Sequence, residues 1–328
     1  MKFWTRLACV LAGTAAAGLG APVLATDEPA APAKAAARAV VEIKPDRIIL
    51  MDLEKAGDRL VAVGERGYAL LSDDGGKSWK AVATSVTRTL TSVAFENAKL
   101  GVASGHGGTV VRTEDGGETW THVPLDEAAG ESLLGATSLG GGRFLVYGAF
   151  GMYFDSSDGG KTWQKRMVLA EDFDRHISDV LPVGNALLLV AESGTIARSD
   201  DGGQTWTPIP SPYAGSFFGA LVAPDGSILA YGMRGSAYRT ADFGATWQKV
   251  ETGTLQAFNG GRVLGDGRIL LVGNVGLVAE SRDNGQSFTS HLSPEGRGFA
   301  AVVETSSGLM SAGEGGIDTI DPAWLGRK

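Results

Sequence analysis

The sequence predicts an all-β fold, a seven-bladed β-propeller, and two periodic motifs support this prediction. One motif is a box of the form S/T-x-D-x-G-x-S/T-W/F, whose aspartates recur at steps of 41, 43, 43, 41 and 41 residues. The other is a Gly-x-x-Gly-like turn, which precedes each box and occurs seven times in all. A fixed period in this range indicates that each repeat forms one small sheet. The six boxes are Ser72–Trp79, Thr113–Trp120, Ser156–Trp163, Ser199–Trp206, Thr240–Trp247 and Ser281–Phe288.

The box residues suit a tight turn that leads into a strand. The Asp and Ser/Thr side chains can accept hydrogen bonds from backbone N–H groups of the turn, and the glycines supply positive φ angles. The closing Trp or Phe is expected to open a strand and to bury its ring between neighbouring sheets. The aspartate spacing also resembles a calcium loop, but the terminal Glu of an EF-hand is absent. We therefore expect structural turns, with no metal and no cofactor.

Each unit is expected to contain four short strands at even spacing. The third strand ends at the box, the fourth begins after the aromatic residue, and the second ends at the Gly-x-x-Gly turn. Small residues two positions along the innermost strand suit strands that crowd around a central axis. The innermost strands are expected to begin near Leu90, Leu133, Ile177, Phe217, Phe258 and Phe299.

The seventh unit has the Gly-x-x-Gly turn but no box, because Asp321-Pro322 follows its third strand. Its missing fourth strand is predicted at Val40–Lys44, upstream of the first complete unit. Pairing of this segment with the last unit would close the ring and remove an open sheet edge, which favours aggregation. The propeller is therefore expected to span residues 40–328.

The first 25 residues have the pattern of a secretory signal peptide, with a basic start, the apolar run Leu7–Leu19 and a small-residue cleavage site ending at Ala25. The apolar run is too short for a good membrane span. Residues 26–39 are rich in Ala, Pro and Lys and are predicted to form a flexible linker. The one cysteine, Cys9, lies in the signal, so the mature chain is expected to lack disulfides and thiol catalysis. These features predict a periplasmic protein.

The charge of the mature chain restricts its partners. Removing the two basic residues of the signal from the 29 in the whole chain leaves 27 against 37 acidic residues, a formal charge of −10. This balance argues against nucleic acid as the main partner. A chain of this length buries roughly 75% of its unfolded surface, so folding does not require a metal or disulfides. No other stretch is long and apolar enough to span a membrane, and we expect a soluble monomer.

The boxes resemble the bacterial-neuraminidase repeat of sialidases, other glycosidases and sortilin-type receptors. Sialidases usually carry an Arg-Ile-Pro signature, and the nearest match here, Arg47-Ile48-Ile49, lacks the proline. The combined unit of turn and box, in near-unbroken series after an export signal, is more similar to the seven-bladed photosystem II assembly-factor propellers and their relatives in non-photosynthetic bacteria. Members of that family are non-enzymatic and act in membrane-protein assembly. The resemblance covers roughly residues 40–328 and implies a non-catalytic exported scaffold that binds a membrane-protein complex or its subunits.

The alternative is a sialidase-like glycoside hydrolase. Asp179 on an innermost strand, with Asp52 as a companion, could supply the paired carboxylates of a glycosidase. Carboxylates that face a channel are equally often only solvated, and no motif marks a catalytic cluster. Arg112, Arg198 and Arg239 share one repeat position just before the box and are expected to form a ladder of surface charges.

The two faces of the ring are expected to differ in function. The boxes repeat nearly unchanged on one face, the box face, whereas the Gly-x-x-Gly turns and the loops between blades vary on the other, the turn face. Variable loops on a rigid scaffold usually carry binding, and a specific partner needs an aromatic or Arg anchor within a polar rim. The turn face, with its longest loop at 164–176, is therefore the predicted docking surface. The predicted partner-binding residues are Arg66, His106, Phe150, Lys165, Arg166, Arg175, His176, Arg234 and Asn274, with Glu192 and Glu314 at comparable turns.

Overall fold

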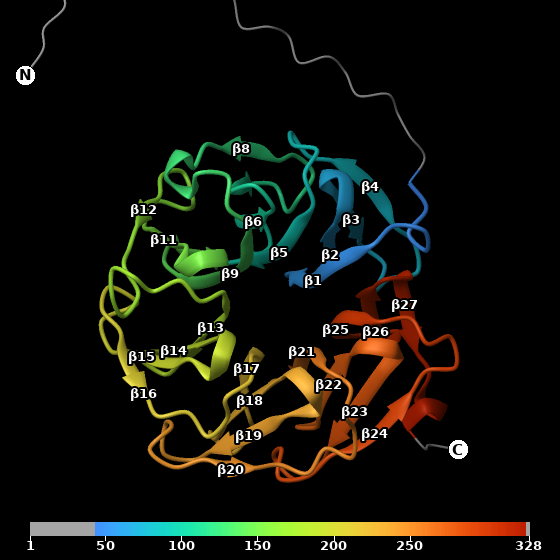
Figure 1. Cartoon of the computed structure of the whole chain (residues 1–328). Helices are drawn as coiled ribbons and strands as arrows, with labels where there is room; N and C mark the ends of the chain where they lie inside the picture. Colours follow the sequence, from blue (N-terminus) through green and yellow to red (C-terminus); the bar gives the residue numbers. More distant parts are fainter. Residues whose placement is uncertain (1–42, 326–328) are drawn as a thin grey trace, which may run out of the picture. The chain divides into compact units, whose positions relative to one another are not determined.

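Seven antiparallel sheets stand as blades around a central axis (Figure 1). The computed structural model describes residues 43–325, apart from the side chain of Ala323, and these residues lie in one compact unit. Six sheets have four strands, and the last has three strands within the described range. The prediction of an all-β, seven-bladed propeller is therefore confirmed.

The strands follow the predicted order in every blade, from the axis outward. Blades are numbered here in chain order, so that β1–β4 form blade 1 and β25–β27 form blade 7. The innermost strands are β1 (Leu50–Ala56), β5 (Leu90–Phe95), β9 (Leu133–Gly140), β13 (Ile177–Val183), β17 (Phe217–Val222), β21 (Phe258–Val263) and β25 (Phe299–Thr305). The second strands are β2 (Arg59–Gly64), β6 (Gly101–Gly105), β10 (Arg143–Gly148), β14 (Ala186–Ala191), β18 (Ile228–Gly232), β22 (Ile269–Gly273) and β26 (Gly308–Gly313).

The outer half of each blade contains the turn and the box. The third strands are β3 (Tyr68–Ser72), β7 (Thr109–Thr113), β11 (Tyr153–Ser156), β15 (Ile196–Ser199), β19 (Ala237–Thr240), β23 (Leu277–Ser281) and β27 (Gly316–Ile320). The fourth strands are β4 (Lys80–Ala83), β8 (Thr121–Val123), β12 (Gln164–Lys165), β16 (Thr207–Ile209), β20 (Gln248–Lys249) and β24 (Thr289–Leu292). Short 3-10 helices complete the described chain: η1 (Glu65–Gly67), η2 (Asp126–Ala128), η3 (Ala149–Gly151), η4 (Glu192–Gly194), η5 (Met233–Gly235), η6 (Asn274–Gly276) and η7 (Pro322–Leu325).

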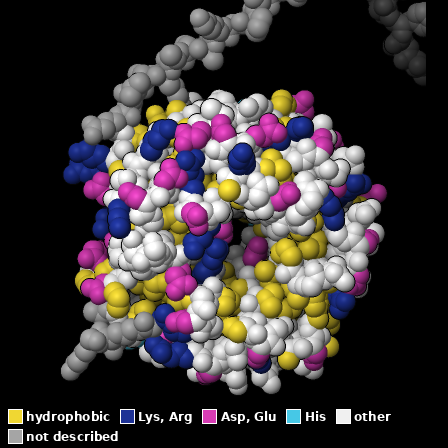
Figure 2. All heavy atoms as spheres, turned by 180° about the vertical axis from the view of Figure 1, so that it is seen from behind, with side chains coloured by type: hydrophobic (Ala, Val, Ile, Leu, Met, Phe, Trp, Pro, Cys, Tyr) yellow, Lys and Arg dark blue, Asp and Glu magenta, His cyan; other side chains and the backbone are white. Residues whose placement is uncertain are grey.

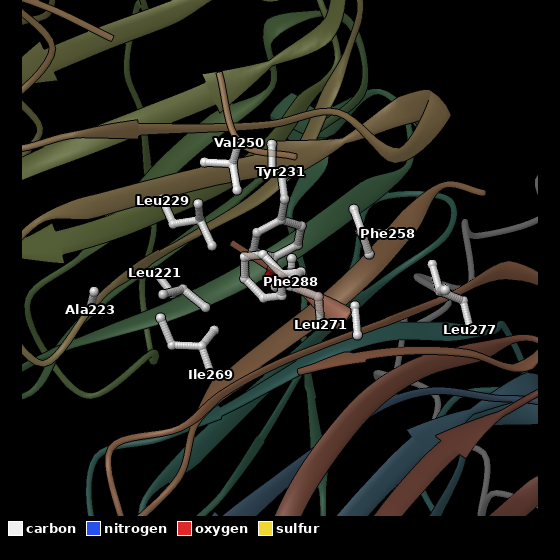
Figure 3. Packing of buried hydrophobic residues seen from close by; sticks show 12 residues of the cluster. Leu221, Ala223, Leu229, Tyr231, Val250, Phe258, Ile269, Leu271, Leu277 and Phe288 are labelled. Atoms are coloured by element: carbon white, nitrogen blue, oxygen red, sulfur yellow. The ribbon is translucent and has the colours of Figure 1, made fainter. Parts of the chain in front are cut away.

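The core lies between adjacent blades, and the box aromatics complete it. Trp206 packs with Leu145 of blade 3 and Leu189 of blade 4, and its ring meets that of Tyr153 edge-on at 5.8 Å between centroids. Figure 3 shows the equivalent packing between blades 5 and 6, where Phe288 and Tyr231 lie among aliphatic side chains. The predicted burial of the box aromatic between neighbouring sheets is confirmed at these two boundaries.

The box itself is a closed set of hydrogen bonds, seen at Ser199–Trp206. The Ser199 hydroxyl donates to Asp201 Oδ1 at 2.8 Å and accepts from the N–H of Gly203 at 2.8 Å. The hydroxyl and N–H of Thr205 donate to the two oxygens of Asp201 at 2.6 and 3.0 Å. The other five boxes repeat these contacts. The aspartate oxygens are thus used within the turn, as expected of a structural role.

These hydrogen bonds predict a loss of stability in acid. The hydroxyl and N–H of Thr205 lower the pKa of Asp201 to about 2, below the value of about 3.9 for an unfolded aspartate. A carboxylate with a depressed pKa contributes stability above the unfolded pKa and loses it as pH falls through the folded pKa. We expect the free energy of unfolding, measured in urea, to fall as pH drops from about 4 to about 2.

The contribution of one box can be isolated by substitution. Asp201→Asn should reduce this acid dependence, because its side chain no longer titrates. Asp58→Asn, in the exposed β1–β2 turn, is the control. An acid dependence equal in wild type and Asp201→Asn would contradict the assignment.

Arginines link the boxes of neighbouring blades, which differs from the expected surface ladder. Arg112 donates to the Gly159 carbonyl, and Arg239 donates to the Asn284 carbonyl at 3.0 Å, each in the box turn of the next blade. Arg198 stacks on Phe243 of the next box, with its guanidinium carbon 4.4 Å from the ring centroid. The same link is made from second strands by Arg59, to the Gly116 carbonyl, and by Arg143, to the Gly202 carbonyl. The surface-ladder prediction is wrong because each side chain extends over the blade boundary.

The predicted closing strand, Val40–Lys44, falls partly outside the described residues. Residues 40–42 are not described, and Ile43 and Lys44 are not in a strand. The described end nevertheless contacts blade 7, since the Pro45 carbonyl accepts a hydrogen bond from the Ile317 N–H at 2.9 Å. A Cβ at Gly316 would lie 1.8 Å from the Pro45 oxygen, just as one at Gly67 would meet the Val86 oxygen after β4. Pro45 therefore stands where other blades place the residue that follows the fourth strand, and closure by Val40–Lys44 stays a prediction.

Candidate functional site

The tips of the turns on the turn face have a backbone that exposes their side chains. In five blades the middle turn residue has a left-handed φ between 51° and 60° although it is not glycine. Such conformations cost about 1 kcal/mol or more and persist only where the surrounding structure imposes them. These tip residues are Arg66, Phe150, Ser193, Arg234 and Val275.

The predicted residues of the comparable turns do lie in these turns, at two different positions. Arg66, Phe150 and Arg234 are tip residues, as grouped. His106, Asn274 and the glutamates Glu192 and Glu314 stand one residue earlier. The second group therefore does not share the left-handed backbone of the tip residues. Their side chains instead bond within the face: His106 Nδ1 lies 3.0 Å from Ser132 Oγ, and Asn274 accepts a hydrogen bond from Asn259 at 2.9 Å.

The exposed apolar side chains concentrate on the turn face. Seven large hydrophobic residues in the described range are exposed, and six lie in its turns, in the adjoining loops or, for Met51, at the start of β1. Leu292, on an outermost strand, is the exception. Sequence reasoning found only Phe150 among the six. Met167 and Leu255 occupy loops without a repeated motif, whereas Val275 stands at the tip of a repeated turn. The six are Ile49, Met51, Phe150, Met167, Leu255 and Val275.

Phe150 and the loop before blade 4 form the best-defined part of the predicted surface. The Phe150 ring is 53% exposed and lies 4.9 Å from the His176 ring, centroid to centroid. The carbonyl of Arg175 accepts a hydrogen bond from the Gly151 N–H at 2.9 Å, which fixes the loop to the turn. The exposed Arg175 side chain has Asp174 at 3.7 Å. An exposed aromatic beside cationic and acidic groups is thus held on a fixed support.

The other predicted contact residues are spread around the ring. Arg66 and Arg234 project from blades 1 and 5 and are exposed. Lys165 lies on the outermost strand β12, and the next residue, Arg166, forms an ion pair with Asp155 at 2.5 Å. The structure therefore brings Phe150, Arg175 and His176 together. Lys165 and Arg166 lie at the outer edge of the same blade as Phe150, and the other predicted residues lie in separate blades. A partner that touched all of them would have to cover much of the face.

A central cavity of about 840 Å³ runs along the axis between the innermost strands. Asp52 and Asp179 line it, three blades apart in the ring of seven. Asp52 accepts hydrogen bonds from the Val93 N–H and the Ser92 hydroxyl of blade 2, both at 2.9 Å. Asp179 likewise accepts from the Ala220 N–H of blade 5 at 3.0 Å. Each carboxylate thus joins its blade to the next, where a β-bulge frees a backbone N–H.

The cavity wall shifts the protonation of both acids. Burial and the charge of Glu54 raise the pKa of Asp52 to about 6, against three hydrogen bonds that favour the ionised form. Burial raises the pKa of Asp179 above its ordinary value. Both groups are therefore more easily protonated than solvated aspartates, although neutral pH still favours ionised Asp52.

Near its box-face end the cavity is lined by a salt bridge between non-adjacent blades. Arg262 of blade 6 contacts Glu54 of blade 1 at 2.6 Å, with blade 7 between them in the ring. Figure 2 shows basic and acidic side chains beside the central hole. The one arginine of the cavity lining, Arg262, is thus already paired with a carboxylate.

The described residues contain neither a metal-binding cluster nor a helix suited to crossing a membrane. Within residues 43–325 no group of three or more His, Cys, Asp or Glu side chains is placed to hold a metal ion. No helix of the described chain has the length and apolar character needed to cross a bilayer.

Comparisons with known proteins give a family and a fold. The family model described as photosynthesis system II assembly factor YCF48 matches residues 71–305. A structure described as YCF48 bound to D1 peptide has 20% identity and a TM-score of 0.66, covering 84% of this chain and 93% of that chain. YCF48 from Cyanidioschyzon merolae has 16% identity and a TM-score of 0.67, covering 84% and 95%. The WD40 propeller domain of Doa1 has 13% identity and a TM-score of 0.66, covering 84% and 95%. No curated protein matches this chain.

Proposed function

We propose a function from the premise that the chain belongs to the photosystem II assembly factor YCF48 family, whose model matches residues 71–305. The protein is a non-catalytic scaffold that binds a segment of a membrane-protein subunit with its turn face and helps that complex to assemble or work. One structure of similar fold is described as bound to a peptide of D1, which supports a peptide segment as the ligand class.

The concentration of exposed apolar side chains carries the proposal. Six of the seven such residues in the described range lie on the turn face. Exposed aromatic and aliphatic side chains within a polar rim are typical anchors of protein contact sites. The rigid tip conformation of Phe150 and Arg234 favours binding, because less side-chain and backbone freedom is lost on association.

The cellular location is a further part of the proposal. Export to the periplasm rests on the signal-like residues 1–25. A scaffold on that side of the membrane would meet exported loops and termini of membrane proteins.

The test compares an exposed apolar residue at a turn tip with an exposed apolar residue on the outermost strand of a blade. A photo-crosslinking amino acid at position 150 should capture a membrane-protein subunit from native membranes, whereas the same group at position 292 should not. The two side chains are both 53% exposed, so accessibility is matched. With the captured subunit in purified form, Phe150→Ala combined with Arg234→Glu should weaken binding by at least ~2 kcal/mol, the scale of an interface hot spot, or roughly 30-fold.

Two results would contradict the proposal. Normal binding by the double variant, together with capture from position 292, would assign docking to the outermost strands at the rim of the ring. Turnover of aryl glycosides or sialosides that is lost in a folded Asp179→Asn variant would identify a hydrolase instead. Thermal unfolding of each variant must accompany these measurements, because Asp179 also joins blades 4 and 5.

A further inference from the structure

Two tyrosines reach the central cavity from the second strands of their blades. A Cβ at Gly135 would lie 2.1 Å from the Tyr147 ring, and one at Gly219 would lie 2.5 Å from the Tyr231 hydroxyl. Both tyrosines line the cavity. Glycine is therefore required at these two positions, because a tyrosine ring of the same blade occupies the space of a side chain. The expected crowding around the axis does apply at Gly260, where a Cβ would lie 2.3 Å from the Ala300 oxygen.

The two tyrosine hydroxyls differ in their partners. Tyr147 donates to Asp179 Oδ1 at 3.1 Å and lies 3.0 Å from the Thr137 hydroxyl. Tyr231 is 5% exposed, and its hydroxyl forms no hydrogen bond with any of the described residues. Buried polar groups normally have a partner, so a hydroxyl that lines a cavity without one points to a ligand or solvent contact there.

Asp179 and Tyr231 converge at the start of β17. The Tyr231 hydroxyl reaches Gly219, and the Asp179 carboxylate accepts a hydrogen bond from the next residue, Ala220. Asp179 and Asp52 also raise the pKa of Tyr231, after the larger effect of burial. A carboxylate has about four acceptor sites, so Asp179 can accept further donors beside those it already has.

The cavity carries an excess of negative charge. Its lining contains Asp52, Glu54 and Asp179 but one arginine, Arg262, which is paired with Glu54. His106 lines the cavity at the turn-face side and contacts Ser132. Two carboxylates in the wall are therefore left without a cationic partner among the described residues.

We propose that the cavity binds a cationic group with several N–H donors, an alkylammonium or guanidinium, between Asp179 and Tyr231. The carboxylate accepts from the cation, and the tyrosine oxygen supplies a further acceptor. Met51, Leu134 and Phe218 line the cavity near the starts of their strands and suit an aliphatic stem. The cation can belong to a free amine or to a lysine or arginine of a partner that covers the turn face. The site does not depend on the proposed function, because Asp179 and Tyr231 are not among the predicted docking residues.

The test uses N-acetyl-lysine methylamide and its uncharged norleucine analogue, titrated calorimetrically into the full chain. The lysine derivative should bind with saturation, and the norleucine analogue should bind at least about tenfold more weakly. Tyr231→Phe should weaken the lysine derivative about tenfold, the effect of one hydrogen bond to a charged group. Asp179→Asn should weaken it further.

Tyr153→Phe is the matched control. Its hydroxyl is buried and has no partner in the described chain, but it lies beside Gly203 and outside the cavity lining. This variant should bind the lysine derivative as wild type does. Equal binding of the two compounds, no saturable binding, or unchanged affinity in Tyr231→Phe would overturn the proposal.

A competition experiment separates the two sources of the cation. Capture from position 150 identifies the subunit, and competition is measured on reversible binding of that subunit in purified form. If spermidine displaces it, the cation belongs to the partner. If spermidine binds to the cavity without displacing it, the ligand is a free amine. If the Tyr231→Phe variant still binds the subunit but no longer binds the amine, the cavity site has been separated from the docking surface of the proposed function.

Discussion

Trp206→Ala is expected to lower the free energy of unfolding by about 3–5 kcal/mol, the usual cost of truncating a buried tryptophan. The ring fills the boundary between blades 3 and 4, where it packs with Leu145 and Leu189 and against the ring of Tyr153. Its removal leaves a cavity at a junction that joins two sheets, so both lose apolar contacts. Urea unfolding followed by tryptophan fluorescence and by far-ultraviolet circular dichroism measures the loss.

The control for this prediction is Leu292→Ala, which truncates an exposed side chain of an outermost strand. Surface changes of this kind usually alter stability by less than about 0.5 kcal/mol. Equal stabilities of Trp206→Ala and Leu292→Ala would show that the box aromatic does not hold the blades together.

Removal of the chain through Pro45 is expected to lower the free energy of unfolding by roughly 3 kcal/mol or more, from one lost aliphatic burial and one lost backbone hydrogen bond. Ile43 packs against the core between blades 1 and 7, and the Pro45 carbonyl bonds the Ile317 N–H of β27. The truncation also leaves β27 without its predicted outer neighbour, and an open edge favours association. Thermal unfolding and light scattering of the truncated protein test both effects.

A shorter truncation, ending at Ala39, serves as the control because it leaves the predicted closing strand in place. It should unfold at the temperature of the mature protein. Identical unfolding of the two truncated forms would argue that Val40–Lys44 takes no part in closure.

Periodicity made the fold predictable, because the box and the turn mark fixed points of every blade. The innermost strands begin at Leu90, Leu133, Ile177, Phe217, Phe258 and Phe299, as predicted. Each box has its own turn chemistry, so local sequence was enough to locate the third and fourth strands. The count of seven turns against six boxes gave the number of blades.

Contacts between repeats were less accessible to sequence reasoning. The link from Arg112 to the Gly159 carbonyl spans 47 residues and leaves no local pattern. The glycines at 135 and 219 carried a usable signal, since a tyrosine stands twelve positions later in both blades. That pairing could have predicted a ring in the glycine's space. Exposed Met167 and Leu255 had no such signal, because exposure of a loop residue depends on how the whole loop packs.

The arginine links between blades all run in one direction, from each blade to the box of the next. Five consecutive boundaries have such a link, from blade 1 through to blade 6. Within the described residues, neither boundary of blade 7 has an arginine link. Blade 7 has no box to accept a link from blade 6, and its described residues include no arginine that bonds to the box of blade 1. Cooperative opening in repeat proteins follows the weakest interface between neighbours. The arginine links therefore form an open series from blade 1 to blade 6, and opening at blade 7 requires the loss of other contacts, such as the hydrogen bond from the Gly265 N–H to Glu304 at 2.7 Å.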